Sequence, residues 1–519
     1  MDRGRIEFEL KFTGPPADLA ALPANDFFAA LAPSSGEGGG SWERLSSAYY
    51  DTIDGALAAR GLSMRLREEG ADLVQAVKAK SKDATRRLEF ETFLDRASDF
   101  PVATGDEDID RLIAGHRDRL LPLAKTIVDR WASVIRFKGA EIELAVDLGS
   151  AEALDGEGRA HMGPLAEVEL ELIAGEPAAV FDFARLLVAN APLRFSTVSK
   201  LETALARLPG ADPVGKAARV DLDPEMSAGE VLAMSLSACA TRASSLQGAL
   251  VDLRRTEGVH QMRVVLRRLR AMERIYRRHL KSGEIADLAA RAKTFAAGLG
   301  PARDWDVFLG ETLPAALEAD YAPESLRALK ATAEAKRAEG WAKAVAIICS
   351  PAFTRFLIDL AAAGSLQRWR EDVRAPLDRP VTEFAPKALD RALRKTFRTA
   401  EEVKGAVDLA ARHPLRIALK KLRYPVQLFR DLYPKERRKP YMSALSELQD
   451  AFGAVNDSVV AQHLADEAAQ GGAKGNGEGA MRAAGFISGY KAAEAREAAK
   501  KIDAAFEAFE KMTPFWRET

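Results

Sequence analysis

The chain has 519 residues, of which 47% are hydrophobic and 29% are charged, so it can bury a core and is neither disordered nor fibrous. No apolar run reaches about 18 residues, which excludes a membrane span, and the charged first residues do not resemble a secretory signal. The formal net charge is −1, but residues 1–205 carry −11 and residues 206–519 carry +10, which indicates two domains with different electrostatic tasks.

Alternating charged and apolar residues predict β-strands in the first part of the chain. In the segment 6–12 every charge falls on one face of a strand and every apolar side chain on the other. Similar alternation recurs at 64–67, 73–80, 88–93, 141–144 and 167–172. Helical patterns interrupt the strands near 16–31, 106–121 and 177–190. This series predicts an antiparallel sheet or barrel with flanking helices.

The charged faces of these strands hold both signs. The acids are Glu7, Glu9, Glu89, Glu91, Glu143, Glu167, Glu169 and Glu171, and the bases are Lys11, Arg65, Arg67, Lys78, Lys80 and Arg136. If these faces are solvated, the alternation means little. If they line a barrel, the enclosed charges persist only when they are paired or bound to a ligand. Carboxylates suit Mg²⁺ or Mn²⁺, and Arg and Lys suit phosphates, so the enclosed arrangement predicts a site for an anion with a hard cation.

A linker separates this part from a helical one. Residues 206–226 are rich in Pro and Gly, and from about residue 227 onward strand-like alternation disappears in favour of Ala, Leu, Arg and Glu. We therefore predict domains at 1–205 and 227–515.

The helical part contains an internal duplication. His260–Arg270 matches His413–Arg423, 153 residues later, and Gly300, Asp304 and Val307 match Gly453, Asp457 and Val460 at the same offset. Two motifs with one offset predict two helical subdomains related by pseudo-symmetry, at about 227–375 and 380–515.

Each duplicated helix carries a cationic stripe opposite an apolar one. A solvated face would mix charges of both signs, whereas a purely cationic stripe repels itself unless a polyanion neutralises it. Aromatic residues are sparse on the stripes, which disfavours nucleic acid and favours a phosphate polymer. Metal binding by His260 and His413 is the weaker alternative to phosphate contact. The predicted polyphosphate-binding residues are His260, Arg263, Arg267, Arg270, Arg274, His413, Arg416, Lys420, Lys421 and Arg423.

Residues 1 to about 205 resemble the CYTH domain of triphosphate tunnel metalloenzymes. The resemblance rests on an ordered set of residues: Glu7-x-Glu9-x-Lys11, the segment 49–52, Arg65-x-Arg67, Lys78, Glu89, Arg130, Asp147, Glu167-x-Glu169 and Ser199-Lys200. It implies an eight-stranded antiparallel tunnel that binds triphosphate with a divalent metal. By position, the resemblance assigns phosphate binding to Lys11, Arg65, Arg67, Lys78, Arg130 and Lys200. It assigns metal binding to Glu7, Glu9, Glu89, Asp147, Glu167 and Glu169, with Glu7, Glu9 and Lys11 as the catalytic set.

Residues from about 225 to 515 look like a CHAD domain. The duplicated His-x-x-Arg motif carries this resemblance, which implies an all-helical pseudo-twofold domain associated with inorganic polyphosphate. The second copy departs from the first at Pro425 and at Asn456, which stands where the first copy has Arg303. The order of the two domains resembles bacterial inorganic triphosphatases.

These observations favour Mg²⁺- or Mn²⁺-dependent hydrolysis of inorganic triphosphate in the tunnel, with polyphosphate binding on the helical part. One alternative is a polyphosphate-binding or granule-targeting protein. Another is a tunnel enzyme that acts on a nucleoside or thiamine triphosphate, or resembles an adenylate cyclase. Cys239 and Cys349 lie in apolar, Ala-rich contexts, so we expect both to be buried in a reducing cytoplasm, where association with polyphosphate granules is a further expectation.

Overall fold

A computed structural model describes most of the chain, in two compact units. The described residues are 4–25, 40–69, 72–81, 83, 85–212, 221–251, 255–281, 283–319, 323–371, 373, 375, 377–404, 410–470 and 477–517. Unit 1 comprises Met1–Ala218, Leu236–Leu253 and Ile348–Arg368, and unit 2 comprises Arg219–Ser235, Arg254–Ile347 and Trp369–Thr519. Residues 213–220 of the predicted linker lie outside the described residues, and the domain borders read from the sequence stay predictions.

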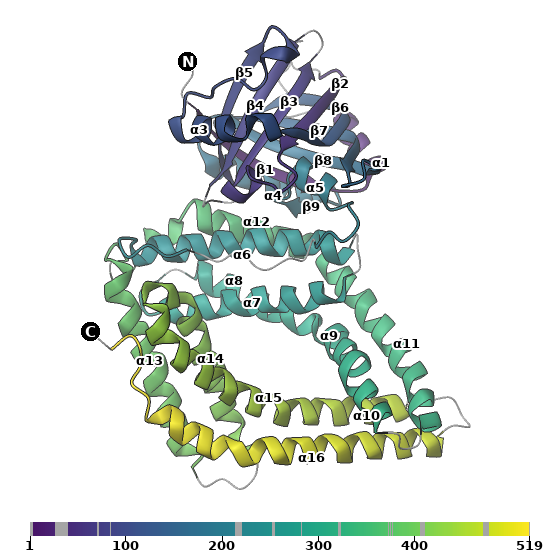
Figure 1. The fold of residues 1–519 in the computed structure, drawn as a ribbon, viewed down its shortest axis with the longest axis vertical. Coiled ribbons are helices and arrows are strands. Elements are labelled where there is room, and N and C mark those ends of the chain that lie inside the picture. Colours follow the sequence, from purple (N-terminus) through teal and green to yellow (C-terminus); the bar gives the residue numbers. More distant parts are fainter. Residues whose placement is uncertain are drawn as a thin grey trace. The chain divides into compact units, whose positions relative to one another are not determined.

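Unit 1 is built on a closed antiparallel barrel (Figure 1). The strands are β1 (Arg5–Thr13), β2 (Glu43–Asp51), β3 (Leu62–Glu69), β4 (Asp72–Lys80), β5 (Arg86–Leu94), β6 (Leu121–Phe137), β7 (Ala140–Leu154), β8 (Ala160–Ala174) and β9 (Arg194–Ser196). Eight strands follow the order β5-β4-β3-β2-β6-β7-β8-β1, and β1 closes the barrel by pairing with β5 as well as β8. The short β9 adds to β1. The predicted eight-stranded antiparallel barrel is confirmed.

Helices cover the outside of the barrel, which explains why the apolar face of each strand is buried as well as the charged one. They are α1 (Pro16–Ala20), η1 (Leu22–Ala24), η2 (Ala58–Arg60), η3 (Ala97–Asp99), α3 (Glu107–His116), η4 (Arg117–Arg119) and α4 (Pro177–Asn190), whereas α5 (Lys200–Leu205) packs against inward-facing strand residues. Phe181 of α4 packs edge-on against Phe8 of β1, with ring centroids 5.7 Å apart. Ile109 and Ile113 of α3 join the cluster around Met64 of β3.

Unit 1 also contains α12 and most of α6, two helices that come from the helical part of the sequence. The Thr354 hydroxyl of α12 donates to the Leu193 carbonyl before β9 at 2.9 Å. Arg185 of α4 donates to Asp359 of α12 at 2.7 Å. On α6, the Ser244 hydroxyl accepts from the amide of Thr197 at 2.8 Å. The barrel is therefore completed by helices that lie far from it in sequence.

The remaining elements are helices. They are α6 (Ala228–Val251), α7 (Thr256–Tyr276), α8 (Glu284–Gly298), α9 (Gly300–Val307), η5 (Phe308–Thr312), α10 (Leu313–Glu318), α11 (Pro323–Ile348), α12 (Pro351–Ser365), η6 (Arg368–Arg370), α13 (Val381–Glu402), η7 (Ala410–Arg412), α14 (His413–Phe429), η8 (Arg430–Leu432), α15 (Lys435–Gln470) and α16 (Gly477–Glu510). No single described helix is long and apolar enough to cross a membrane; α11 and α12 reach that length and composition only as a pair bent by 52°.

The helix borders follow the duplication seen in the sequence. A shift of 153 residues places α6 on α13 and α7 on α14, and it places α8, α9, η5 and α10 together on the single long helix α15. Pro425 lies inside α14, which continues past it to Phe429. The expectation that both cysteines are buried is half wrong, because Cys239 is buried and Cys349 is exposed at the end of α11.

The hydrogen bond between α12 and the barrel predicts a local contribution to stability. Thr354→Ala removes the hydroxyl and leaves the Leu193 carbonyl buried without that donor, which costs about 1–3 kcal/mol of the free energy of unfolding. The matched control is Ser235→Ala, whose buried hydroxyl donates only to the Val231 carbonyl of its own helix. Urea denaturation of both variants measures the difference. Equal losses would contradict a structural link between α12 and the barrel.

Candidate functional site

The charged faces of the barrel strands point into the barrel. Glu7 and Lys11 of β1, Asp147 of β7 and Glu167 of β8 are each at most 6% exposed, and Lys200, the first residue of α5, is 8% exposed. Because strand side chains alternate, the closed barrel turns one charged face of each strand inward. The enclosed arrangement expected from the sequence is therefore the one present.

Three of the six predicted metal ligands lie close together. Asp147, Glu167 and Glu169, which we call the acidic cluster, each offer a carboxylate oxygen, and these oxygens lie within 4.8 Å of one another. Asp147 faces Glu167 across the β7–β8 pair, and Glu169 is the next inward residue of β8. Among the residues that the structure describes, this is the group of carboxylates that could hold a metal ion.

Three cations neutralise the acidic cluster. The Lys200 Nζ lies 2.9 Å from an Asp147 oxygen and 2.8 Å from a Glu169 oxygen, and it also contacts the third carboxylate of the cluster. The Lys11 Nζ lies 2.9 Å from Glu169. The Arg130 guanidinium holds both Asp147 oxygens, at 2.6 and 2.7 Å. A bidentate arginine and two lysines supply the pairing that buried carboxylates require.

Burial and these cations act in opposite directions on the carboxyl groups. Burial favours the neutral acid, but at Glu169 the charges of Lys11 and Lys200 outweigh it and hold the pKa well below its usual range. At Asp147 the same competition, with Lys200 as the largest opposing charge, also lowers the pKa. At Glu167 burial prevails and raises the pKa. The cluster thus contains neighbouring carboxyl groups with different proton affinities.

A second group of charges forms around Lys78. Its Nζ lies 2.7 Å from a Glu7 oxygen and 3.1 Å from a Glu89 oxygen. Burial raises the pKa of Glu7 to about 7, although the charge of Lys78 opposes this. The remaining predicted metal ligand, Glu9, lies 3.5 Å from the Lys11 Nζ. Burial raises its pKa, but the charges of Lys11, Lys78 and Arg87 together outweigh burial and lower the pKa of Glu9 to about 2. Glu7 and Glu89 therefore form a separate group around Lys78, whereas Glu9 is linked to the acidic cluster through Lys11, which also contacts Glu167 and Glu169.

Two arginines of β3 keep donors free inside the barrel. Arg65 lies 3.4 Å from Glu91, and Arg67 lies 3.6 Å from the same carboxylate. The Nε atoms of both are buried and have no hydrogen-bond partner among the described residues. An unsatisfied guanidinium donor in a closed interior is available to an anion.

Two of the bases that were predicted to line the barrel interior lie at the surface instead, and one base on the inner face was not predicted. Lys80 and Arg136 are exposed and pair with Glu202 and Glu141. Arg87 of β5 faces Glu7 across the β1–β5 pair, so both side chains share the inner face. Although burial opposes it, the carboxylates of Glu9 and Glu7 raise the pKa of Arg87. Its position two residues before Glu89 was the signal in the sequence.

The interior is charged on one side and apolar on another. Leu201 and Ala204 of α5 pack in a buried cluster with barrel residues that include Leu45, Val128 and Leu165. The Ser199 side chain caps α5, and Glu202 completes a capping box with it. This local structure fixes the helix that brings Lys200 to the acidic cluster.

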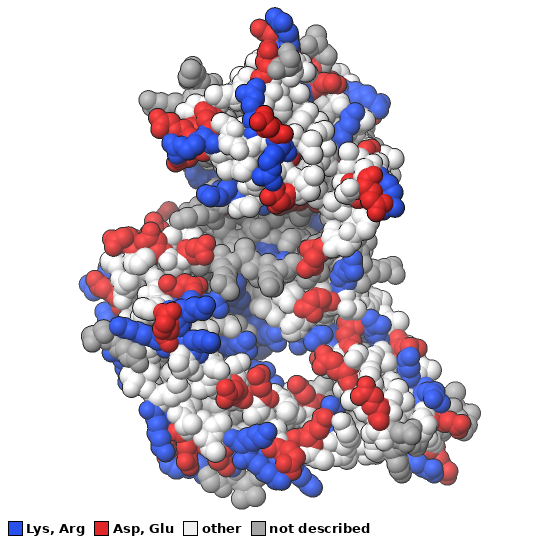
Figure 2. All heavy atoms as spheres, in the orientation of Figure 1, with Lys and Arg blue, Asp and Glu red and all other residues white. Residues whose placement is uncertain are grey.

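In unit 2, the two predicted cationic stripes come together in one basic surface. Helices α7 and α14 pack against each other. Lys420 of α14 is close enough to Arg267 of α7 to interact electrostatically, and Lys421 to Arg270 and Arg274. Figure 2 shows Lys and Arg gathered where Figure 1 draws α7 and α14.

Some residues of the basic surface are held by neighbouring helices, whereas others keep free donors. Arg263 donates to the Ala296 carbonyl at 2.9 Å, and Arg423 donates to Gln449 at 3.0 Å. By contrast, the Nε atoms of Arg267 and Arg416 are buried without a hydrogen-bond partner among the described residues.

Helix α13 adds cations that the sequence analysis missed. Lys395 interacts with Lys421 and Arg391 with Arg278, which extends the basic surface beyond α7 and α14.

His260 lies among arginines, and burial together with Arg303 lowers its pKa. His413, its counterpart on α14, is exposed.

The duplicated Gly-x-x-x-Asp motifs meet beside the basic surface. Asp304 interacts with Arg263, and Asp457 with Arg416 and Lys420. The two aspartates also interact with each other. The pseudo-symmetry expected from the sequence therefore places equivalent acids side by side.

Both halves of the chain match known families. The CYTH domain model matches residues 5–205, and the CHAD domain model matches residues 237–466. Among solved structures, the CHAD domain from the plant Ricinus communis is similar with a TM-score of 0.50 and 26% sequence identity, covering 59% of this chain and 98% of that chain.

Two curated relatives share part of the sequence. A protein of Haemophilus influenzae named inorganic triphosphatase is 26% identical over 166 residues, which are 30% of this chain and 44% of that relative. An uncharacterized protein of Mycobacterium tuberculosis is 27% identical over 449 residues, which are 82% of each. The chain thus matches less than half the length of the first relative and most of the second.

The position of Lys200 predicts a link between stability and divalent cations. Lys200→Met leaves the acidic cluster short of one counter-charge, which costs about 3–5 kcal/mol of unfolding free energy in EDTA. Millimolar Mg²⁺ or Mn²⁺ restores part of this loss, because a cation then takes the place of the ammonium. The matched control is Lys80→Met, whose exposed pair with Glu202 contributes about 0–1 kcal/mol. Thermal denaturation with and without metal tests both; an unchanged Lys200→Met melting temperature would contradict the account.

Proposed function

Because the chain joins an N-terminal CYTH domain to a C-terminal CHAD domain, we propose that its tunnel hydrolyses inorganic triphosphate with Mg²⁺ or Mn²⁺ and that its basic surface binds inorganic polyphosphate. The observation that carries the first part is the closed barrel, whose interior holds carboxylates beside Arg and Lys side chains. The likeness to a protein named inorganic triphosphatase supports this choice of substrate.

The donor set fits a hard divalent cation. Asp147, Glu167 and Glu169 present oxygens close enough to share one ion, and oxygen is the ligand that Mg²⁺ and Mn²⁺ prefer. Lys200 sits among these oxygens and balances their charge when no cation is bound. A bound cation supplies Lewis acidity toward phosphate oxygens.

The barrel's own cations position and neutralise the substrate. The free Nε donors of Arg65 and Arg67 face the interior, and Lys78 and Lys11 extend the positive side. Phosphoryl transfer depends mainly on positioning and on stabilising charge in the transition state. A triphosphate would thus exchange its hydration for fixed donors in a water-poor interior.

Two carboxyl groups are suited to accept a proton from an attacking water. Burial raises the pKa of Glu7 to about 7 and that of Glu171 to about 6, and a base works best when its pKa is near the working pH. The two residues lie on neighbouring strands, because Glu171 pairs with Glu9 across the β1–β8 pair. Either carboxylate would hold the released proton inside the barrel.

A tunnel enzyme that acts on a nucleoside or thiamine triphosphate remains the alternative, and substrate comparison separates the two. We expect phosphate release from inorganic triphosphate only with Mg²⁺ or Mn²⁺, and slower release from ATP and thiamine triphosphate. Glu169→Gln lowers kcat/KM by about 100-fold or more, because it removes a charged oxygen from the acidic cluster. The control Glu141→Gln alters an exposed pair with Arg136 and leaves the rate unchanged. No metal-dependent hydrolysis by the native protein would overturn the proposal.

Polyphosphate binding to the basic surface should weaken as the pH rises. Burial, together with Arg416 and Arg267, lowers the pKa of Lys420 to about 8, and a bound polyanion raises it again. The free protein loses this charge between pH 7 and pH 9, so affinity falls by about tenfold. Lys420→Arg keeps its charge, and its affinity stays level over this range. Fluorescence anisotropy with labelled polyphosphate measures both; identical pH profiles would contradict the role of Lys420.

A further inference from the structure

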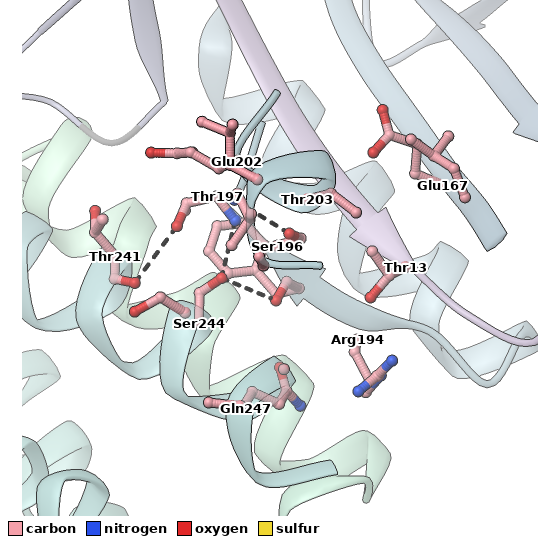
Figure 3. A pocket seen from close by; sticks show the side chains of 18 of the residues that line it. Thr13, Glu167, Arg194, Ser196, Thr197, Glu202, Thr203, Thr241, Ser244 and Gln247 are labelled. Carbon is pink, nitrogen blue, oxygen red and sulfur yellow. Dashed lines mark hydrogen bonds between the residues drawn. The ribbon is translucent and has the colours of Figure 1, made fainter. Parts of the chain in front are cut away.

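A cavity of about 820 Å³ lies within unit 1, between the barrel and α6 (Figure 3). The barrel side includes Thr13 at the end of β1, Glu167 of β8 and Arg194 of β9. The other side is the segment 241–249 of α6. One wall is formed by residues that match the CYTH model and the other by residues that match the CHAD model. The cavity therefore requires both parts of the chain.

The wall from α6 differs from its equivalent in the second repeat. At a shift of 153 residues, small or uncharged side chains on α6 stand where α13 has large or charged ones. The pairs are Thr241 and Arg394, Ser244 and Phe397, Ser245 and Arg398, and Gly248 and Glu401. Gln247 is the exception, because it is larger than its counterpart Ala400. The small side chains of α6 make room for the cavity. Because this wall lacks the arginines that α13 has at the equivalent positions, it is unsuited to a bare phosphate chain.

Gln247 places an unsatisfied acceptor at the cavity. Its side chain is 1% exposed, and its Nε2 donates to the Ile348 carbonyl at 2.7 Å. Its Oε1 is buried and accepts no hydrogen bond from the described residues. A buried polar atom without a partner is unfavourable, so this oxygen calls for a donor from a bound molecule. Because α13 has Ala400 at this position, helix packing alone does not require the amide.

The remaining lining carries charges of both signs with an excess of cations: Lys80, Arg86, Arg87, Arg194 and Arg207 against Asp83, Glu167, Glu202 and Asp212. Lys80 and Arg86 are paired with Glu202 and Asp83, at 2.7 and 3.4 Å. Arg87 also lines the cavity, and no described carboxylate lies within 4.0 Å of its guanidinium nitrogens. This arginine supplies a donor for an anionic group at the point where the cavity meets the barrel interior.

Apolar side chains lie between these polar ends. Phe195 of β9, Val198 in the chain before α5, and Leu205 of α5 line the cavity. Ligand sites commonly combine such walls with a few fixed polar groups, in volumes of roughly 300–1,000 Å³. Orthophosphate or polyphosphate would leave the apolar wall and the Gln247 oxygen unused.

We propose that this cavity binds an organic phosphate of nucleotide size, separately from the tunnel substrate. Its phosphate group contacts Arg87 and Arg194, its body packs on Phe195 and neighbouring side chains, and a donor on that body reaches Gln247 Oε1. Because Arg87 shares the inner barrel face with Glu7, occupancy changes the charge presented to the tunnel. The ligand would therefore act as an effector of the tunnel.

Isothermal titration of the full chain with nucleoside monophosphates tests this site. AMP, GMP, CMP and UMP contain no phosphoanhydride bond, so binding is measured without hydrolysis, in EDTA and with excess inorganic triphosphate to fill the tunnel. We expect at least one of them to bind at least tenfold more tightly than its nucleoside or orthophosphate. Ala206→Phe fills the cavity from the partly exposed end of α5 and weakens binding at least tenfold. Its matched control, Ala191→Phe at the end of α4, lies outside the cavity lining and retains binding.

Melting temperatures confirm that each variant is folded, and Arg194→Met provides a second, charge-removing variant with the same expected loss. Absence of millimolar binding by all four nucleotides overturns the proposal. So does binding that survives both Ala206→Phe and Arg194→Met, or that orthophosphate matches in affinity. Triphosphate hydrolysis is assayed separately, so failure of this site leaves the proposed tunnel activity standing.

Discussion

The enclosure of opposite charges in a closed barrel is the constraint on which the rest of unit 1 depends. Burying a carboxylate is costly unless a cation accompanies it, and the barrel buries several. Lys11 and Arg130 come from strands, whereas Lys200 must be delivered by α5, whose cap and apolar packing hold it in place. A bound metal would pair with the carboxylates, and a bound phosphate chain would pair with the Lys and Arg side chains. Binding would therefore replace existing ion pairs without leaving a buried charge unpaired.

The same chain uses one duplicated helical unit for two purposes. Helix α13 keeps the cations of its repeat and contributes them to the basic surface. Its counterpart α6 keeps a cation, Arg242, at the position of Lys395 but has Ala238, Thr241 and Ser245 where α13 has arginines. It packs against the barrel, with Ser244 bonded to the chain beside β9. A pseudo-twofold repeat can thus contribute cations to a basic surface with one copy of a helix and complete a neighbouring domain with the other.

The sequence predicts what is local and misses what depends on distant contacts. Strict alternation in the segment 6–12 predicts the inward charges, because side-chain direction in a strand has a period of two. The same rule places Lys80 on the inner face but cannot show that it lies at the strand end, where it is exposed. Arg87 was missed because Arg86 precedes it and interrupts the alternation. The membership of α12 in unit 1 depends on contacts that join residues more than 150 positions apart, such as those of Thr354 with Leu193.

The most direct test of the central claim is to locate a cation inside the barrel. Crystals of the protein grown with Mn²⁺ and inorganic triphosphate, measured at the manganese edge, would show an anomalous peak wherever the ion is bound. The account predicts a peak within about 2.0–2.6 Å of the carboxylate oxygens of Asp147, Glu167 or Glu169, with Lys200 displaced from them. A fully occupied peak only on the outer surface, with the lysine contacts intact and triphosphate outside the barrel, would contradict it.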